Sequence, residues 1–163
     1  MKFYINQSTG TDALFTIIDS VGQSVYCVTG DTTSIGSKYY LVDKDKNQVA
    51  RISKVGFPTI SKYTITIDDN DKAHVTQNLA SSHHMIKIKG KKWRFRGDLL
   101  TRSYDLIDTD SSVVMTHGRC WNENGNCFAV DILDESNVVL CLCIAVILDS
   151  TLIGGSAKPL PVS

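Results

Sequence analysis

Basic residues alternate with apolar residues in MIKIKGKKWRFRG, which runs from Met85 to Gly97. Glycine at the first position of a two-residue turn favours a type II′ hairpin, so the sequence predicts a β-hairpin with its turn at Gly90-Lys91. Its inward face would carry Ile86, Ile88, Trp93 and Phe95, and its outward face Lys87, Lys89, Lys92, Arg94 and Arg96. Lys and Arg side chains on a rigid pair of strands suit phosphate. These five cations are therefore the candidate anion-binding site.

The ligand of such a site could be a phospholipid headgroup or an acidic protein surface, and a solvated strand face without a ligand explains the same residues. Nucleic acid is disfavoured because no aromatic side chains interleave with the cations of the outer face, as base stacking requires. The chain has 17 Lys and Arg residues against 17 Asp and Glu residues. It therefore lacks a global field that would attract DNA or anionic membranes, and any electrostatic function must be local.

A zinc site is the main metal alternative. The stretch HGRCWNENGNC brings His117, Cys120 and Cys127 near one another, with His83 or His84 as a possible fourth ligand. The spacing fits no common zinc motif, so an exposed histidine beside structural thiols is the preferred interpretation. A nucleophilic pair of Cys120 and His117 lacks an orienting acid in the surrounding sequence.

Calcium and the common catalytic motifs are also disfavoured. The run DKDKN from Asp43 imitates the start of an EF-hand loop, but Gln48 takes the place of the required glycine and Lys54 that of the bidentate glutamate. A hairpin turn explains the run instead. The chain has no P-loop, no G-x-S-x-G and no H-E-x-x-H motif. We therefore expect neither an enzyme nor a cofactor.

The five cysteines indicate a reducing compartment. They are Cys27, Cys120, Cys127, Cys141 and Cys143. An odd number without a C-x-x-C pair, behind an N-terminus that does not resemble a signal peptide, predicts free thiols in a cytoplasmic protein.

One long apolar stretch, VVLCLCIAVIL, runs from Val138 to Leu148. As a helix, the 12 residues from Asn137 to Leu148 would span roughly 18 Å, and a bilayer core needs about 30 Å. The stretch is thus too short to cross a membrane and predicts a buried helix. Asp134 or Ser136 could cap its start, and Gly154-Gly155 should end it.

The rest of the chain repeats a hairpin pattern. An aromatic residue, alternating apolar residues, an Asp and a polar turn recur from Phe15, Tyr39, Tyr63, Tyr104 and Phe128, with a longer turn expected in the third copy. Period-two alternation broken by Asp, Asn, Gly and Ser indicates β-hairpins. Many short strands need closure to lose their edges, and a helix that is apolar on every side must be surrounded by protein. The predicted fold class is mainly β: a closed antiparallel barrel of about 12 strands around a central hydrophobic C-terminal helix.

The hairpins of the form Y-x-I-x-D…V, the segment WRFRGDLLTRSYDLID and the ending FAVDILDESNVVLCLCIAVILD resemble the LURP-one-related family over about residues 2–153. That family belongs to the tubby C-terminal-like group, as do the phospholipid scramblases, and the compact length is similar to its bacterial branch. The resemblance implies a barrel around a C-terminal helix. Tubby proteins bind phosphoinositides, but their basic lipid site has no residue-by-residue match in this chain.

Two functional classes follow. The first is a non-enzymatic binding or scaffold module, cytoplasmic or peripheral at the inner membrane surface, that uses the basic hairpin. The second is a membrane-associated, scramblase-like protein whose helix would leave the barrel. We expect a single domain over residues 1–153 and a flexible tail over 154–163, and the sequence leaves the oligomeric state open.

Overall fold

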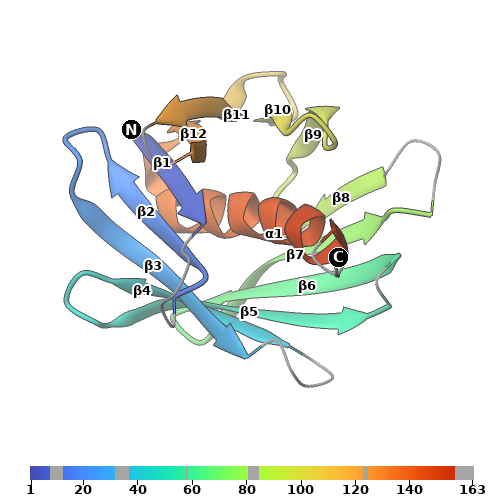
Figure 1. Ribbon diagram of the computed structural model, residues 1–163. Helices are drawn as coiled ribbons and strands as arrows, with labels where there is room; N and C mark the ends of the chain where they lie inside the picture. Colours follow the sequence, from blue (N-terminus) through green and yellow to red (C-terminus); the bar gives the residue numbers. More distant parts are fainter. Residues whose placement is uncertain (8–12, 32–36, 58, 81–84, 123–124, 157–163) are drawn as a thin grey trace, which may run out of the picture.

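The computed structural model describes residues 1–7, 13–31, 37–57, 59–80, 85–122 and 125–156. Twelve strands form one antiparallel sheet that curves around a single long helix (Figure 1). The elements are β1 (Lys2–Gln7), β2 (Phe15–Asp19), β3 (Ser24–Asp31), β4 (Lys38–Asp43), β5 (Gln48–Gly56), β6 (Ile60–Ile67), β7 (Asn70–Asn78), β8 (Met85–Lys89), β9 (Arg94–Asp98), β10 (Ser103–Ile107), β11 (Val113–Asn122), β12 (Gly125–Ile132), the 3-10 turn η1 (Glu135–Asn137) and α1 (Val138–Ser156). The predicted fold class is confirmed.

The barrel is nearly closed rather than fully closed. β1 pairs with β12, so the sheet runs in the order β8-β7-β6-β5-β4-β3-β2-β1-β12-β11-β10-β9. Its two edges are β8 and β9, which are consecutive in the chain but pair only with β7 and β10, respectively. We call the unpaired boundary between β8 and β9 the seam. The predicted barrel is thus nearly closed, with one opening at the seam.

The predicted hairpin at Gly90-Lys91 is wrong, because β8 and β9 do not pair. In that hairpin Lys89 would face Lys92, and like charges placed directly opposite one another are unfavourable. The connection between the strands instead occupies residues 90–93. Gly90 has a φ of 98°, and a Cβ there would lie 2.4 Å from the Lys72 carbonyl oxygen. Glycine thus lets the end of β8 press against β7, while Trp93 turns inward and is buried.

A recurring aspartate builds three of the hairpin turns. In each, the Asp stands at the end of the first strand or directly after it. Its Oδ1 accepts hydrogen bonds from the backbone N–H groups two and four residues later, at 2.8–3.1 Å for Asp19, Asp43 and Asp108. The residue three positions after each Asp has a positive φ, as a type I turn followed by a bulge requires. The EF-hand-like run is thus a hairpin turn, as predicted.

The β6–β7 connection differs from these turns and from the prediction. It is a two-residue turn made by Asp68 and Asp69, which have φ values of 54° and 60°. Positive φ at both central residues is the signature of a type I′ turn. The turn in the third copy is therefore shorter, not longer, than in the others.

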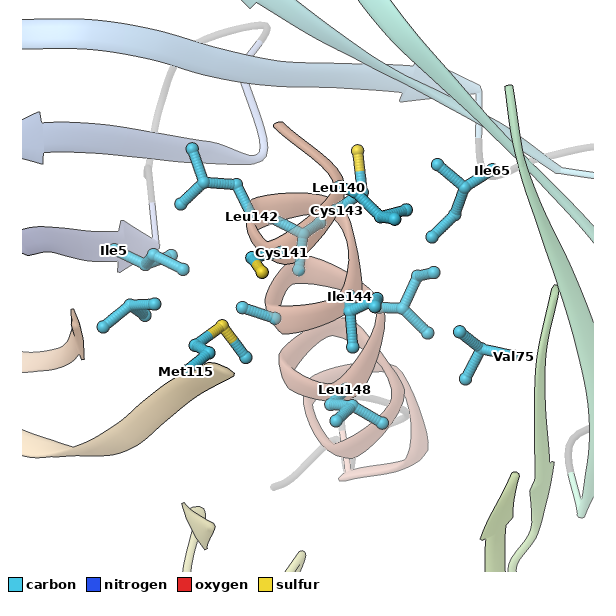
Figure 2. Packing of buried hydrophobic residues seen from close by; sticks show 14 of the residues in the cluster. Ile5, Ile65, Val75, Met115, Leu140, Cys141, Leu142, Cys143, Ile144 and Leu148 are labelled. Carbon is cyan, nitrogen blue, oxygen red and sulfur yellow. The ribbon is translucent and has the colours of Figure 1, made fainter. Parts of the chain in front are cut away.

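The apolar stretch forms the centre of the core. Every side chain from Leu140 to Leu148 is at most 3% exposed. Figure 2 shows these side chains leaving α1 in different directions, toward Ile65 and Val75 on one side and toward Ile5 and Met115 on the other. All four of those strand residues are fully buried. The helix therefore replaces the side-chain layers that would otherwise fill a barrel of this size.

The ends of α1 agree only partly with expectation. Asp134 caps the preceding turn η1, and its carboxylate accepts hydrogen bonds from Ser136 Oγ at 2.6 Å and Asn137 Nδ2 at 2.7 Å. The glycines did not end the helix, because α1 continues through Gly154 and Gly155 to Ser156. Residues 157–163 of the predicted tail lie outside the described residues.

The cysteines also depart from the prediction. Cys120 and Cys127 face each other across β11 and β12, with Cα atoms 5.2 Å apart, and form a disulfide. The expectation of five free thiols is wrong for this pair, because strand register brings two distant side chains together. The other three, Cys27, Cys141 and Cys143, are free. Burial raises the pKa of the Cys141 and Cys143 thiols to about 12, so both stay protonated and unreactive near neutral pH.

We predict that Ile144→Asp prevents folding, because it places an unpaired carboxylate among apolar side chains. The expected loss, more than about 4 kcal/mol, is a large part of the stability of a single domain. Circular dichroism and size-exclusion chromatography would measure it. Leu133→Asp is the control, since Leu133 is 56% exposed and tolerates a charge. Recovery of a well-folded Ile144→Asp protein would contradict the position of α1 in the core.

Candidate anion-binding surface

The structure places the five predicted cations on two strands that do not pair. Lys87 and Lys89 are exposed on β8, Lys92 is exposed in the connection, and Arg94 and Arg96 are exposed on β9. The alternation of the sequence is confirmed, since Trp93 is buried and Ile86, Ile88 and Phe95 are partly buried against the core. The five cations thus border the seam instead of sharing one hairpin.

Arg96 differs from the other four cations because it is neutralised. Its Nη2 lies 2.8 Å from Asp105 Oδ2 on β10, directly opposite in the register. No ion pair within 4.0 Å joins Lys87, Lys89, Lys92 or Arg94 to a carboxylate in the part of the chain that the structure describes. These four side chains keep their charge available to a ligand.

Strand register extends the β8 cations across the outer surface. Lys87 lies opposite Thr76, Thr76 opposite Lys62, and Lys62 opposite Val55. Side chains opposite one another in an antiparallel pair point to the same face, with strands about 4.8 Å apart. Lys62, which is exposed, therefore joins Lys87 in one row.

A second row runs beside the first. Lys89 lies opposite His74, and the row continues through Thr64 and Ser53 to Lys38 on β4. Thr64 Oγ1 and His74 Nδ1 are 3.0 Å apart, which ties the middle of the row together. We call Lys38, Lys62, Lys87 and Lys89 the basic face. Sequence reasoning missed Lys38 and Lys62 because they are 23 or more residues from β8 in the chain, and only register joins them.

The acidic residues are gathered elsewhere. Successive antiparallel strands alternate in direction, so the β2–β3, β4–β5, β6–β7 and β10–β11 turns lie at one end of the barrel. That is also the end where β12 leads into α1. The turns carry Asp19, Asp43, Asp68, Asp69 and Asp108. The neutral chain is thus electrostatically polarised, with an acidic end and a separate basic face.

A cleft of about 410 Å³ opens at the same end, beside the start of α1. Lys72, Lys91 and Glu135 line it. Its cations are already engaged or balanced: Lys91 Nζ lies 5.7 Å from the centre of the Trp93 ring, and the carboxylates of Asp134 and Glu135 flank the helix start. Hydrogen bonds from Ser136 and Asn137 lower the pKa of Asp134, so this carboxylate is ionised near neutral pH. The mixed charge makes the cleft a weaker anion site than the basic face.

His117 was expected to be exposed, but it is buried against α1. Its side chain is 0% exposed, and its Nε2 lies 3.0 Å from Oδ1 of Asp149, whose side chain is 1% exposed. The histidine packs between the rings of Tyr104 and Phe128, with centroids 4.4 and 5.3 Å away. His117 therefore does not join Cys120 and Cys127 as a metal ligand. Among the described residues, no three His, Cys, Asp or Glu side chains gather closely enough to hold a metal.

The hydrogen bonds of His117 indicate how many protons His117 and Asp149 hold together. Nδ1 lies 2.7 Å from the Arg102 carbonyl oxygen, which can only accept, so Nδ1 carries a proton. Nε2 faces the Asp149 carboxylate, so a second proton must lie between these two groups. Burial, and then the charge of Asp149, raise the pKa of the adjacent Tyr104 hydroxyl well above its ordinary value, so Tyr104 stays neutral. The cluster joins α1 to β11 without a net charge.

Comparisons with known proteins agree with this architecture. The family model for LURP-one-related proteins matches residues 1–149. The uncharacterized protein YxjI of Bacillus subtilis is 27% identical over 138 residues, which cover 85% of each chain. The crystal structure of a protein from Arabidopsis thaliana superposes with a TM-score of 0.59 at 16% identity, covering 91% of this chain and 90% of the other. That structure supports the fold.

We predict a hierarchy of stabilities at the buried pair. His117→Leu leaves the Asp149 carboxylate unpaired and should lower the free energy of unfolding by about 3–5 kcal/mol. Asp149→Asn should cost only about 1 kcal/mol, because its amide can donate to Nε2 of a neutral histidine. Urea denaturation measures both, and the double variant with leucine at 117 and 149 should be more stable than His117→Leu. If His117→Leu and Asp149→Asn lower the free energy of unfolding equally, the expectation of a proton between His117 and Asp149 is contradicted.

Proposed function

The chain belongs to the LURP-one-related family, and from that premise we propose that it is a non-enzymatic binding module that attaches to anionic lipid headgroups through its basic face. One observation carries the proposal. Exposed lysines from separate strands share one outer face, and none of Lys62, Lys87 and Lys89 has a carboxylate partner among the described residues.

The geometry favours an extended anionic surface over a single small anion. Lys62 and Lys87 are separated by β7, so two steps of about 4.8 Å part their backbones. That spacing leaves each ammonium group free to meet a different headgroup. Each basic residue near an anionic membrane contributes about 1 kcal/mol, and salt weakens the attraction. These charges support the proposal that the protein attaches peripherally at the inner membrane surface.

The basic residues across the seam widen the same surface. Lys92 and Arg94 are exposed and begin the β9 side, next to Lys89 at the end of β8. The β8–β9 connection is at the end of the barrel that carries the acidic turns, so Lys92 and Arg94 lie nearer to that acidic charge than Lys62 and Lys87 do.

The scramblase-like alternative has less support. No helix in the described part of the chain is long and apolar enough to cross a membrane. Removing α1 from the barrel would also cost free energy, because it would expose the apolar side chains of the helix and separate Asp149 from His117. We therefore propose headgroup binding with α1 in place.

We predict that wild-type protein sediments with vesicles of phosphatidylcholine and phosphatidylglycerol but not with phosphatidylcholine alone. Replacing Lys87 and Lys89 together with Glu should weaken binding at low salt by roughly thirty-fold or more, since two favourable charges are lost and two unfavourable ones are added. The unfolding temperature should change little, because both side chains are exposed.

The matched control reverses Lys44 and Lys46 in the β4–β5 turn, which changes the net charge equally at the acidic end. That variant should bind nearly as wild type does. Equal sedimentation of wild type and the Lys87/Lys89 variant would refute the basic face as the lipid site. An acidic protein surface would then be the better candidate.

A further inference from the structure

One turn of the barrel gathers three of the seven exposed large apolar side chains of the described residues. Val55, Phe57 and Ile60 are 57%, 76% and 49% exposed. The other exposed large apolar residues of the described chain are scattered singly, at Met1, Val21, Leu100 and Leu133. We call Val55, Phe57 and Ile60 the apolar tip. Single exposed apolar residues are ordinary, but three within six positions call for an explanation.

The tip is held rigidly by its own hydrogen bonds. Phe57 N–H donates to the Ile60 carbonyl at 2.9 Å, and Ile60 N–H donates to the Phe57 carbonyl at 3.1 Å. Ser61 Oγ donates to the same Phe57 carbonyl at 2.7 Å. Leu79 N–H, from the end of β7, donates to the Thr59 carbonyl at 2.7 Å. These polar groups are therefore already paired, which lowers the cost of moving the turn into an apolar medium.

Gly56 makes this shape possible. Its φ is 113°, a conformation that L side chains rarely adopt. A Cβ at this position would lie 2.5 Å from the Ile60 carbonyl oxygen. The backbone thus turns sharply before Phe57, and the Phe57 ring is left exposed with no described side chain covering it.

Cations flank the tip. Lys62 lies directly opposite Val55, and Lys87 lies in the same row two strands further on. Lys54, half-buried, places its Nζ 5.8 Å from the centre of the Tyr63 ring at the base of the turn. The acidic turns are at the opposite end of the barrel. Each of them joins an even-numbered strand to the next odd-numbered one, whereas the β5–β6 turn joins an odd-numbered strand to the next even-numbered one. Figure 1 shows the turn on the right of the view, the side on which α1 ends.

We infer that the apolar tip inserts into the interfacial layer of an anionic bilayer while the lysines of the basic face contact the headgroups. The inference rests on the proposed function and adds the part of the protein that enters the membrane. Aromatic and aliphatic side chains bordered by Lys or Arg are the composition of surface segments that lie in this layer. Charge complementarity favours anionic lipid as the occupant, since the tip and its flanking lysines face away from the acidic end.

Insertion is tested with Phe57→Ser and Phe57→Trp. Loss of the aromatic ring should weaken sedimentation with phosphatidylglycerol-containing vesicles about tenfold, without a change in unfolding temperature. In Phe57→Trp, the added tryptophan should shift to shorter emission wavelength on vesicle addition and become protected from acrylamide. The emission of wild type, which has Trp93 and Trp121, is subtracted.

Val21→Ser and Val21→Trp are the matched controls. Val21 is also 76% exposed, but it lies in the β2–β3 turn at the acidic end. Neither control should alter binding or show protection from acrylamide.

The outcomes separate this inference from the proposed function. If wild type and Phe57→Ser bind acidic vesicles equally and the tryptophan at 57 stays open to acrylamide, insertion is overturned while headgroup binding stands. The tip would then be a candidate contact for a protein partner. If wild type does not bind acidic vesicles at all, the proposed function and insertion both fail.

Discussion

Between Leu140 and Leu148 the helix α1 has no polar side to present to water, and the arrangement of the sheet follows from that constraint. Its side chains from Leu140 to Leu148 are buried all round, so strands must lie on every side of it. Twelve strands meet this requirement with one inward face each, and the period-two alternation of each strand supplies that face. The barrel and the helix are thus mutually dependent: the helix fills the interior, and the sheet removes the helix from water.

Asp149 is the exception within this buried helix, and it shows how the fold accommodates a charge. A carboxylate at this depth requires a partner, which β11 provides as His117. The histidine is in turn held by the Arg102 carbonyl and by aromatic rings from β10 and β12. The pair fixes the rotation and depth of α1 more specifically than apolar packing alone would. Neither group is positioned to meet a ligand at the surface.

The outer surface has fewer constraints, and the features proposed for binding lie there. The hairpin aspartates are needed to close turns, so acidic charge accumulates at the end where α1 begins. The outer faces of β4–β8 do not take part in turn formation and carry lysines in adjacent rows. The apolar tip extends from the same strands. A chain with zero net charge therefore presents a basic surface, an apolar tip and an acidic end as separate regions.

Several features were determined by the sequence itself. The repeated Asp turns, the strand alternation and the length of the apolar stretch predicted the hairpins and the buried helix, because these depend on residues close together in the chain. The inward positions of Trp93 and Phe95 and the outward positions of the five cations followed from the same alternation. The resemblance to the LURP-one-related family rested on this order of elements, and the family model confirms it.

Tertiary structure decided what depends on residues far apart. The seam lies where two adjacent strands would have placed like charges opposite one another, whereas local turn propensity at Gly90-Lys91 favoured the hairpin. Register joined Lys38 and Lys62 to the β8 lysines, paired Cys120 with Cys127 and neutralised Arg96 with Asp105. It also brought His117 to Asp149, 32 positions away in the chain. Period and turn chemistry are local properties, whereas register and burial arise only when the sheet has closed around the helix.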